Sequence, residues 1–497
     1  MELGKLSIRK DVIEELKSKL GEDNVLTSEF DRITRAMAHC VFPLHRWRMH
    51  TPDVVVTPES TEQVVEIVKT ANKHRVPLVP RSGGSGLSDG ALPLKGGIVV
   101  DMKKMDKILE IDLTNSTATV QAGVSIDELG RALSKYGYIY PDDPASRHVA
   151  VIGARIATNG GSFLSGRYGN PQHLVLSYEI VLPTGKVLRL GGGGGKKIEK
   201  SSSGYNLRSL FFGAQGTLGI ITEVTVEIFP EPEAEYPAVW GFEGIETAYK
   251  TLGRLARSGV ACVGGHALWD EKRVEYYRRY HEVYIPLPPE CKVKISWWLY
   301  GNEDEVEAGR KRFFKICEEG GGVFIGEEPS QVSWGGRHET SVPPLHGRKN
   351  GLACPMVWVM EDPAVNYSEI IPVREKWHKI IEKYKFDDWG IFFLSNRRSG
   401  QGEYTAGVNI GVDETEFLDN EKRWDEFVNC RREIMNVALE HGGSMSGTHG
   451  STEEGKAGLI RRELGDAEFE LMLQLKRTLD PNNIMNPGKW MLDLAYE

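Results

Sequence analysis

The segment Pro80-Arg81-Ser82-Gly83-Gly84-Ser85-Gly86-Leu87-Ser88 restricts the possible folds of this chain more than any other part of it. It follows an apolar run, Val76 to Val79, that predicts a buried strand. Because glycine permits unusual backbone angles and close approach, this loop can place several backbone N–H groups against an anion. We therefore expect it to bind a phosphate or pyrophosphate group.

Three other interpretations of this loop compete with that one. A P-loop needs Gly-Lys-Ser/Thr at the start of a helix, and no lysine follows Gly86. A Rossmann fingerprint needs a helix to begin at the third glycine, but the sequence from Asp89 to Gly97 contains a proline and no helical apolar period. A solvated surface turn stays open at this point, because isolated glycine clusters are common.

The length and composition indicate an ordinary globular protein of two or three domains: 497 residues, 40% hydrophobic and 26% charged. The net charge of −9 disfavours nucleic acid or an acidic membrane as a partner, since both need a basic surface. Six cysteines occur singly, which excludes the usual iron–sulfur and zinc spacings and suits a reducing compartment. The sequence shows neither a signal peptide nor a membrane-spanning run. We expect a cytoplasmic protein, with peripheral membrane attachment through a partner as the alternative.

The apolar patterns of the first half predict mixed helices and strands. A helix is expected over 12–20, and a β-α-β unit over 53–79 whose helix begins at Ser60 or Thr61. The remaining expected elements are strands at 98–102, 108–113, 117–120, 176–182, 187–190 and 224–229, and a helix at 125–136. Pro230 and Pro232 mark a boundary, beyond which most of the tryptophans lie. This second part is either a substrate-enclosing domain with an aromatic lining or a plain aromatic core.

Several other segments poor in bulky side chains lie far from the first loop in sequence. They are 141–161 with Arg167-Tyr168-Gly169 shortly after, 213–222, 442–450 and 480–489. Packing alone explains so many small residues poorly, whereas a backbone wall pressed against a flat ligand explains them well. The segments near the C-terminus indicate that the chain returns to the same ligand.

These segments, in this order, resemble those of the FAD-linked oxidases of the vanillyl-alcohol-oxidase/p-cresol-methylhydroxylase (PCMH) superfamily. Within it the chain most resembles the D-lactate dehydrogenase and glycolate oxidase flavoprotein group, over about 52–489. The resemblance implies an α+β protein with an antiparallel sheet in a cap domain. Its expected parts are an N-terminal helical segment (1–47), a two-subdomain PCMH-type FAD-binding domain (48–230), an α+β cap domain (231–440) and a C-terminal segment that returns to the flavin (441–497).

The resemblance also implies FAD as the cofactor. Residues 80–88 would hold its pyrophosphate through backbone N–H groups. Further contacts would come from Pro144, Ser146, Val151, Gly153, Ala157, Thr158, Asn159, Gly161, Tyr168, Gly216, Gly219, Ile221 and Asn486. Gly219 and Ile221 would lie near the adenosine half, and Asn486 near the flavin ring. Relatives that bind flavin covalently have a histidine where this chain has Ser85, so non-covalent FAD is expected, with a cap histidine as the alternative attachment point.

Three residues are catalytic candidates by the same resemblance. His449 matches the histidine of the family's Glu-His-Gly motif and would act as the base. Arg337, in Trp334-Gly335-Gly336-Arg337, matches the arginine that holds a substrate carboxylate, and Arg348 is a second candidate. Relatives that bind a divalent metal use two histidines and the Glu of that motif. Here the corresponding region, 396–407, has no histidine and Thr448 replaces the Glu, so no metal is expected.

The sequence thus predicts an FAD-dependent oxidoreductase acting on the CH–OH group of a small molecule, in the first place a 2-hydroxy acid such as D-lactate or glycolate. Oxidation of an aromatic alcohol or phenol is the alternative, and an electron-transferring flavoprotein subunit of a larger complex is a third possibility. The electron acceptor would be separate: an iron–sulfur subunit, an electron-transferring flavoprotein, a quinone or dioxygen. A homo-oligomer or a subunit of a complex is expected.

Overall fold

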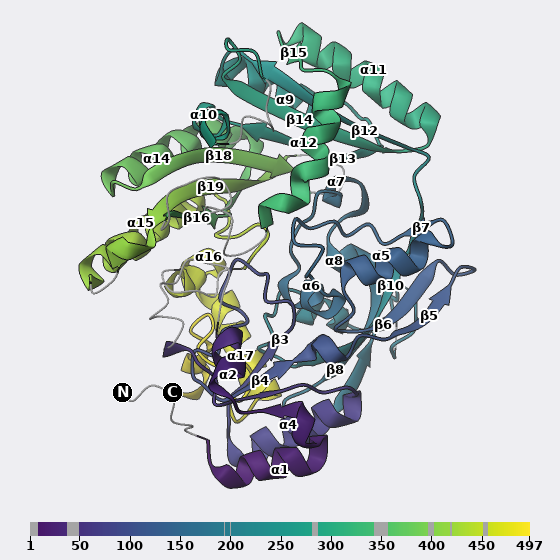
Figure 1. Cartoon of the computed structure of the whole chain (residues 1–497), viewed down its shortest axis with the longest axis vertical. Helices are drawn as coiled ribbons and strands as arrows, with labels where there is room; N and C mark the ends of the chain where they lie inside the picture. The colour runs from purple at the N-terminus through teal and green to yellow at the C-terminus, as the bar shows by residue number, and fades with distance from the viewer. Residues whose placement is uncertain are drawn as a thin grey trace.

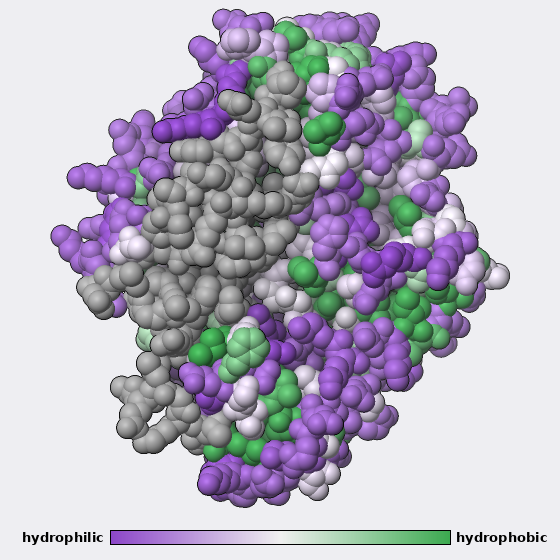
Figure 2. Space-filling view, viewed as in Figure 1, coloured by the Kyte–Doolittle hydropathy of each residue, from purple (hydrophilic) through white to green (hydrophobic). Residues whose placement is uncertain are grey.

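A computed structural model describes residues 8–36, 49–192, 194–198, 200–280, 287–341, 356–395, 402–417, 420–450 and 456–497. Arg348, Cys40 and Cys354 lie outside the described residues. The described residues form three larger sheets and one two-stranded ribbon, with helices packed on the larger sheets, which confirms the mixed α+β class (Figure 1). No helix in the described ranges is long and apolar enough to cross a bilayer. The coloured part of the face shown in Figure 2 is largely hydrophilic, with apolar residues in separate groups.

The first subdomain is built on a four-stranded sheet with the order β1-β2-β4-β3. Strands β2 and β3 both run parallel to β4, which lies between them, so the predicted β-α-β unit crosses over the intervening strand. Ser60 caps the crossover helix by accepting a hydrogen bond from the Gln63 backbone N–H. The elements are β1 (Val25–Leu26), β2 (Val54–Val56), β3 (Leu78–Arg81), β4 (Ile98–Asp101), α1 (Lys10–Leu20), α2 (Glu29–Arg35) and α4 (Thr61–His74).

The second subdomain is an antiparallel five-stranded sheet with the order β5-β6-β10-β8-β9. Ser125 and Glu128 form a capping box at the start of α5, close to the predicted helix boundary. The elements are β5 (Ile108–Asp112), β6 (Thr117–Gln121), β8 (Val175–Val181), β9 (Val187–Leu190), β10 (Ile220–Glu227), the small ribbon β7 (Tyr138–Ile139) with β11 (Phe229–Pro230), α5 (Ile126–Ser134), α6 (Ile152–Thr158), α7 (Ser165–Tyr168) and α8 (Pro171–Leu174). Helix α6 was not predicted, because its small residues leave only a weak apolar period.

The cap is an eight-stranded antiparallel sheet with the order β15-β12-β14-β13-β18-β19-β16, and β17 pairs with β19. Its strands are β12 (Ala234–Phe242), β13 (Val263–Trp269), β14 (Val293–Gly301), β15 (Val323–Phe324), β16 (Met356–Glu361), β17 (Ala364–Asn366), β18 (Asp387–Ser395) and β19 (Glu403–Asp413). Its helices are α9 (Ile245–Ala256), α10 (Glu271–Tyr280), α11 (Glu303–Glu319), α12 (Glu327–Gly335), α14 (Ile370–Lys383) and α15 (Glu421–Glu440).

The two faces of the cap sheet serve different purposes, because successive residues of a strand point to opposite faces. On β18, Ile391 and Phe393 are buried in the core that the sheet shares with α9, α11, α14 and α15. Phe392 and Leu394 alternate with them and line a cavity on the opposite face. The tryptophans predicted as either lining or core are mainly core: Trp240, Trp297, Trp377 and Trp424 are among the largest fully buried side chains.

The C-terminal segment returns to the first subdomain after α16 (Ile460–Leu464) and α17 (Asp466–Leu479). Met485 forms a parallel bridge with Leu78 of β3, and the Asn486 backbone N–H donates to the Leu78 carbonyl at 2.7 Å. In Figure 1 the yellow C-terminal helices lie beside the purple first subdomain. The end of the chain therefore braces the strand from which the glycine-rich loop emerges.

Candidate active site

A cavity of about 310 Å³ lies where the first subdomain, the second subdomain and the cap meet. One wall comes from three segments of the first two subdomains: 80–92, 144–163 and 211–221, with single residues from neighbouring strands. The opposite wall comes from the cap and the C-terminal part, namely Arg273, Met360, Asp362, Phe392, Leu394, Thr405, Gly407, Thr448 and His449. Segments far apart in the chain thus enclose one space, which disfavours the surface-turn interpretation.

The first loop contributes mainly backbone to the cavity. Gly84 has φ of +64°, a conformation that favours glycine, and a Cβ there would collide with the Arg81 guanidinium. Burial outweighs the nearby charge of Asp101 and lowers the pKa of Arg81 to about 10. At Gly86 an added Cβ would meet no protein atom within 4 Å. The loop is thus tightly constrained at Gly84 and open at Gly86.

The second small-residue segment carries a buried ion pair behind the cavity wall. Arg155 of α6 donates from Nε and Nη2 to the two carboxylate oxygens of Asp142 at 2.7 and 2.8 Å. Burial alone would lower the pKa of Arg155, but the paired Asp142 raises it. Gly153 packs so closely on Ala122 that a Cβ would lie 2.5 Å from the alanine methyl. This pairing and packing fix the strip of backbone from Val151 to Gly161.

The third segment, around Gln215, is tied to the first by the C-terminus. The Asn486 side-chain amide donates to the carbonyls of Gly90 and Gln215, both at 2.7 Å. Lys476 Nζ donates to the Thr217 carbonyl at 2.9 Å, and Lys489 Nζ donates to the Asp89 carbonyl at 2.6 Å. These buried donors hold the glycine-rich segments in register with one another.

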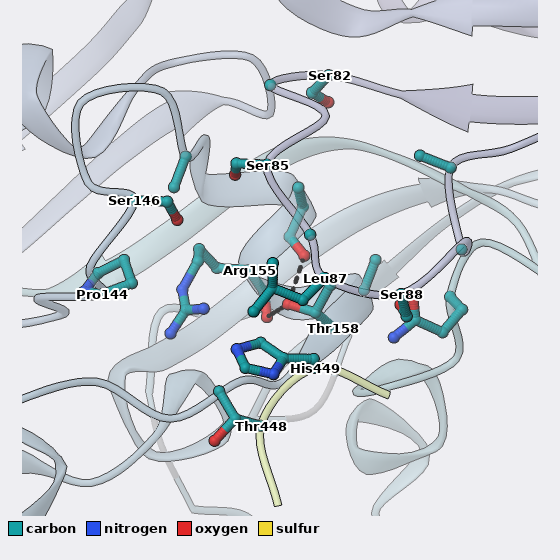
Figure 3. Close-up of a pocket in the computed structure, with 18 of the residues that line it drawn as sticks. Ser82, Ser85, Leu87, Ser88, Pro144, Ser146, Arg155, Thr158, Thr448 and His449 are labelled. Atoms are coloured by element: carbon teal, nitrogen blue, oxygen red, sulfur yellow. Dashed lines mark hydrogen bonds between the residues drawn. The ribbon is translucent and has the colours of Figure 1, made fainter. Parts of the chain in front are cut away.

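The cap wall presents a histidine next to a buried carboxylate. Asp362 follows the last residue of β16, and its Oδ2 accepts the backbone N–H groups of Thr448 and His449 at 2.9 and 2.8 Å. His449 Nδ1 lies 3.1 Å from the same oxygen, a distance that fits an ion pair, while the angle falls outside the range of a hydrogen bond. Figure 3 shows His449 and Thr448 approaching the pocket from the side opposite Ser82 and Ser85.

Asp362 is held in its ionised form by its surroundings. Burial by itself would raise the pKa of Asp362, but His449, Lys456 and the Ser446 hydroxyl lower it. Lys456 Nζ lies 2.7 Å from Glu361 Oε2, and Arg431 pairs with the other oxygen of that carboxylate. This network keeps a negative charge directly behind the imidazole of His449.

Arg337 lies in a separate cluster around Asp143. Its Nε donates to Asp143 Oδ2 at 2.9 Å, and its guanidinium lies 3.9 Å from the centroid of the Trp334 ring. His338 Nε2 and Arg147 Nη1 each lie 2.8 Å from Asp143 Oδ1. Burial would raise the pKa of Asp143, but these partners lower it to about 2. The cluster joins the end of α12 to the residue that precedes Pro144.

Two known domain families match the chain: the FAD binding domain over residues 52–191 and the C-terminal domain of FAD-linked oxidases over residues 231–490. The glycolate oxidase subunit GlcD of Bacillus subtilis is 31% identical over 97% of both chains. The D-lactate dehydrogenase of Archaeoglobus fulgidus is 30% identical over 88% of this chain and 90% of its own.

The chain belongs to the FAD-linked oxidases. It is therefore an FAD-linked oxidoreductase, and its cofactor is FAD. Among solved structures, p-cresol methylhydroxylase with bound substrate superposes with a TM-score of 0.80, at 21% identity and over 98% of both chains. Alkyldihydroxyacetonephosphate synthase gives a TM-score of 0.77 at 22% identity, over 97% of this chain and 86% of its own. At these identities the two structures establish the PCMH-type fold and nothing more.

The cavity of this FAD-linked oxidase fits the cofactor on its own evidence. Its first wall offers backbone and small side chains over its whole length, as a dinucleotide cradle requires. The buried Nε2 of Gln215, a residue in that wall, has no hydrogen-bond partner among the described residues. A polar ligand along this wall would satisfy it.

Most of the predicted cofactor residues line the cavity: all of 80–88, Pro144, Ser146, Val151, Gly153, Ala157, Thr158, Gly161, Gly216, Gly219 and Ile221, together with the predicted base His449. Three predicted cofactor residues do not line it, Asn159, Tyr168 and Asn486, and neither does the catalytic candidate Arg337. Asn159 bonds to Gln172 away from the cavity, and Tyr168 packs against Phe229. Asn486 acts from behind the wall. Arg348 lies outside the described residues.

Sequence reasoning missed three residues of the site: Asp362, Arg155 and Arg273. Arg155 lies within the predicted small-residue segment 141–161 but was not singled out there. Asp362 and Arg273 come from segments without a glycine-rich signature, and only the fold brings them to the cavity. The one usable signal was Glu361-Asp362-Pro363 at the end of an apolar run. The described residues contain no cluster of three or more His, Cys, Asp or Glu suited to a metal, and part of the 396–407 region lies outside them, so the absence of a metal stays a prediction.

Proposed function

We propose that this FAD-linked oxidase oxidises a small 2-hydroxy acid such as D-lactate or glycolate, with FAD bound non-covalently. The observation that carries the proposal is the pair His449–Asp362 on the wall opposite the glycine-rich cradle. The names of two relatives, glycolate oxidase subunit and D-lactate dehydrogenase, support this substrate class.

Bound FAD would supply the hydride acceptor in this reaction. His449 would accept the proton of the substrate hydroxyl as the adjacent C–H bond breaks. Because Nδ1 faces Asp362, Nε2 is the nitrogen left to receive that proton. The ionised Asp362 would hold the imidazole in this orientation and stabilise its protonated form, much as the carboxylate of a catalytic triad does.

Residues 80–88 would hold the pyrophosphate, and the backbone from Val151 to Gly161 would line the rest of the cofactor. In the first loop, Ser85 stands where relatives with covalently bound flavin have a histidine, and Ser85 lines the cavity. We therefore expect acid precipitation of the protein to release the flavin into the supernatant. A flavin that stays with the precipitate indicates covalent attachment.

Electrons would leave to a separate acceptor: an iron–sulfur partner, an electron-transferring flavoprotein, a quinone or dioxygen. The described cysteines, Cys262, Cys291, Cys317 and Cys430, are all buried and free. No two of these four cysteines lie at the short sequence spacing that is usual for the ligands of an iron–sulfur cluster. Reoxidation of the reduced protein by each acceptor class in turn identifies the acceptor.

A second candidate is an aromatic alcohol, because Phe163, Phe392 and Leu394 give the cavity an apolar side. Anaerobic titration of the bound flavin separates the candidates. D-lactate or glycolate should bleach the flavin absorbance within one turnover, and 4-hydroxybenzyl alcohol should not. Bleaching by the aromatic alcohol alone transfers the assignment to that class, and no bleaching by either favours the electron-transferring subunit.

A further inference from the structure

Arg273 places a buried positive charge in the cavity wall. It lies in the first turn of α10, is 4% exposed and lines the cavity together with His449 and Asp362. Its position depends on Gly390 of β18, which has φ of +79°. A Cβ added at residue 390 would collide with the Arg273 backbone nitrogen. The helix can approach the strand this closely because residue 390 is glycine.

The guanidinium of Arg273 has few partners. Nη2 donates to the Tyr277 hydroxyl at 3.3 Å, whereas Nε and Nη1 have no hydrogen-bond partner among the described residues. Nε carries one hydrogen and Nη1 two, so three N–H groups lack an acceptor. Asp270, a fully buried acid three residues before Arg273, is already used: it accepts hydrogen bonds from the backbone of Arg273 and Ile391, and it pairs with Arg374 and His378. Glu271, two residues before Arg273, pairs with Arg374.

The surroundings of this guanidinium are aromatic rings and a second cation. The guanidinium carbon Cζ of Arg273 lies between 4.7 and 5.7 Å from the centroids of four rings, those of Tyr277, Tyr276, Trp269 and Phe392. Lys294, 2% exposed, lies with its Nζ 3.5 Å from the Trp269 centroid. Burial and the charge of Arg273 lower the pKa of Lys294 to about 7. The rings pack against both side chains and supply no negative charge to pair with Arg273.

A buried charge is costly unless an opposite charge and hydrogen bonds compensate for it. The acid on the same wall, Asp362, does not supply this compensation, because it is bonded to Ser446, Thr448 and His449 and lies near Lys456. An anionic ligand in the cavity would pair with the three unused N–H groups. The rings around them exclude water and would strengthen that pairing.

We propose that Arg273, rather than Arg337, binds the carboxylate of the substrate. This inference rests on the proposed oxidation of a hydroxy acid and names the residue that recognises the acid group. The carboxylate would lie under the cap sheet against Arg273, with the hydroxyl-bearing carbon directed to His449. Arg337 keeps its bonds to Asp143 and supports the wall at Pro144.

The test uses the FAD-bound protein and three variants: Arg273→Met, Arg273→Lys and Arg337→Met. Lys272→Met is the matched control, because Lys272 is a cation of the same helix that pairs with Asp388 at the surface, outside the cavity. Two quantities are measured for each: KM for the oxidised hydroxy acid, and the rise in Tm produced by acetate and by benzoate, two carboxylates with no oxidisable hydroxyl.

For Arg273→Met we expect KM to rise on the order of 100-fold, because the charge-assisted hydrogen bonds to the substrate carboxylate are lost. The rise in Tm with acetate and benzoate should disappear, while Tm without them should increase because an uncompensated buried charge has been removed. Arg273→Lys should keep part of the anion effect, and Lys272→Met should match the natural protein in both measurements.

The inference is overturned if Arg273→Met keeps the anion-dependent Tm rise, or if Arg337→Met alone abolishes it. Its failure is distinct from failure of the proposed function. If no 2-hydroxy acid reduces the flavin, the proposed function is wrong, while the acetate and benzoate measurements still decide whether Arg273 is an anion site.

Discussion

The two walls of the cavity differ in the kinds of residue that form them. The wall of the first two subdomains consists of glycine, serine, alanine and backbone, held in place from behind by Asn486, Lys476 and Lys489. The cap wall carries the ionisable groups: His449 and Asp362, which contact each other, and Arg273, which packs among aromatic rings. The first wall is suited to hold a large flat cofactor, and the second to recognise and deprotonate a small substrate.

The largest expected effect falls on the cap wall, at His449→Gln. Loss of the base should lower kcat by ~10²-fold to ~10⁴-fold, while the flavin spectrum and FAD content stay unchanged. Stopped-flow reduction of the bound flavin measures the step directly. A variant that loses its flavin instead would show that His449 belongs to the cofactor cradle, and the division between the walls would be wrong.

The next effect tests the cradle, at Gly86→Leu. An added Cβ at Gly86 meets no protein atom within 4 Å, and Gly86 lines the cavity. We expect the Kd for FAD to rise more than ~10-fold, since the ligand and the leucine compete for one space, with the Tm of the FAD-free protein unchanged. Gly244→Leu, at an equally open position outside the cavity, is the control.

Gly84 would be the natural choice for this experiment from the sequence, and it is a poorer one. Its φ of +64° and its contact with Arg81 mean that any side chain there strains the loop whether or not FAD is present. A loss of flavin in a Gly84 variant therefore does not separate steric exclusion from misfolding.

The same contrast explains what the sequence could predict. The cradle leaves a local trace, because backbone that touches a ligand needs small residues in consecutive positions, as in 80–88 and 151–161. The cap wall leaves none: Asp362 ends a strand, Arg273 begins a helix, and His449 lies in a loop, so only the packing of β16, β18 and α10 brings them together. The family resemblance predicts His449 and Arg337 from their motifs, and no motif marks Arg273.

A third prediction concerns the frame that positions Arg273. His378 lies between Asp270 and Asp388, at 2.8 and 2.7 Å, and these carboxylates outweigh burial and raise its pKa from 6.5 to about 9. A group whose pKa is raised in the folded state stabilises the fold fully below pH 6.5, and this stabilisation is lost as the pH rises through 9. The contribution of His378 to stability should thus fall by about 3 kcal/mol between these values.

His378→Gln removes this titration, so its Tm should be lower than that of the natural protein at pH 6 and should change much less between pH 6 and pH 9.5. Thermal unfolding at both pH values measures the difference. Equal pH dependence in the two proteins would show that the pairing of His378 with Asp270 and Asp388 does not stabilise the cap.

The smallest expected effect tests how the first wall is held from behind, at Asn486→Asp. Asn486 has φ of +43°, which aspartate tolerates nearly as well, so the change removes the amide donor and keeps the backbone. The carbonyls of Gly90 and Gln215 would then lose their shared partner at a cost of about 1–3 kcal/mol. We expect a lower Tm and roughly tenfold weaker FAD binding, with kcat nearly unchanged at saturating FAD, and Asn482→Asp, exposed in the same segment, should change neither. A fall in kcat with unchanged FAD affinity would instead place Asn486 close to the reacting ring, where the family resemblance puts it.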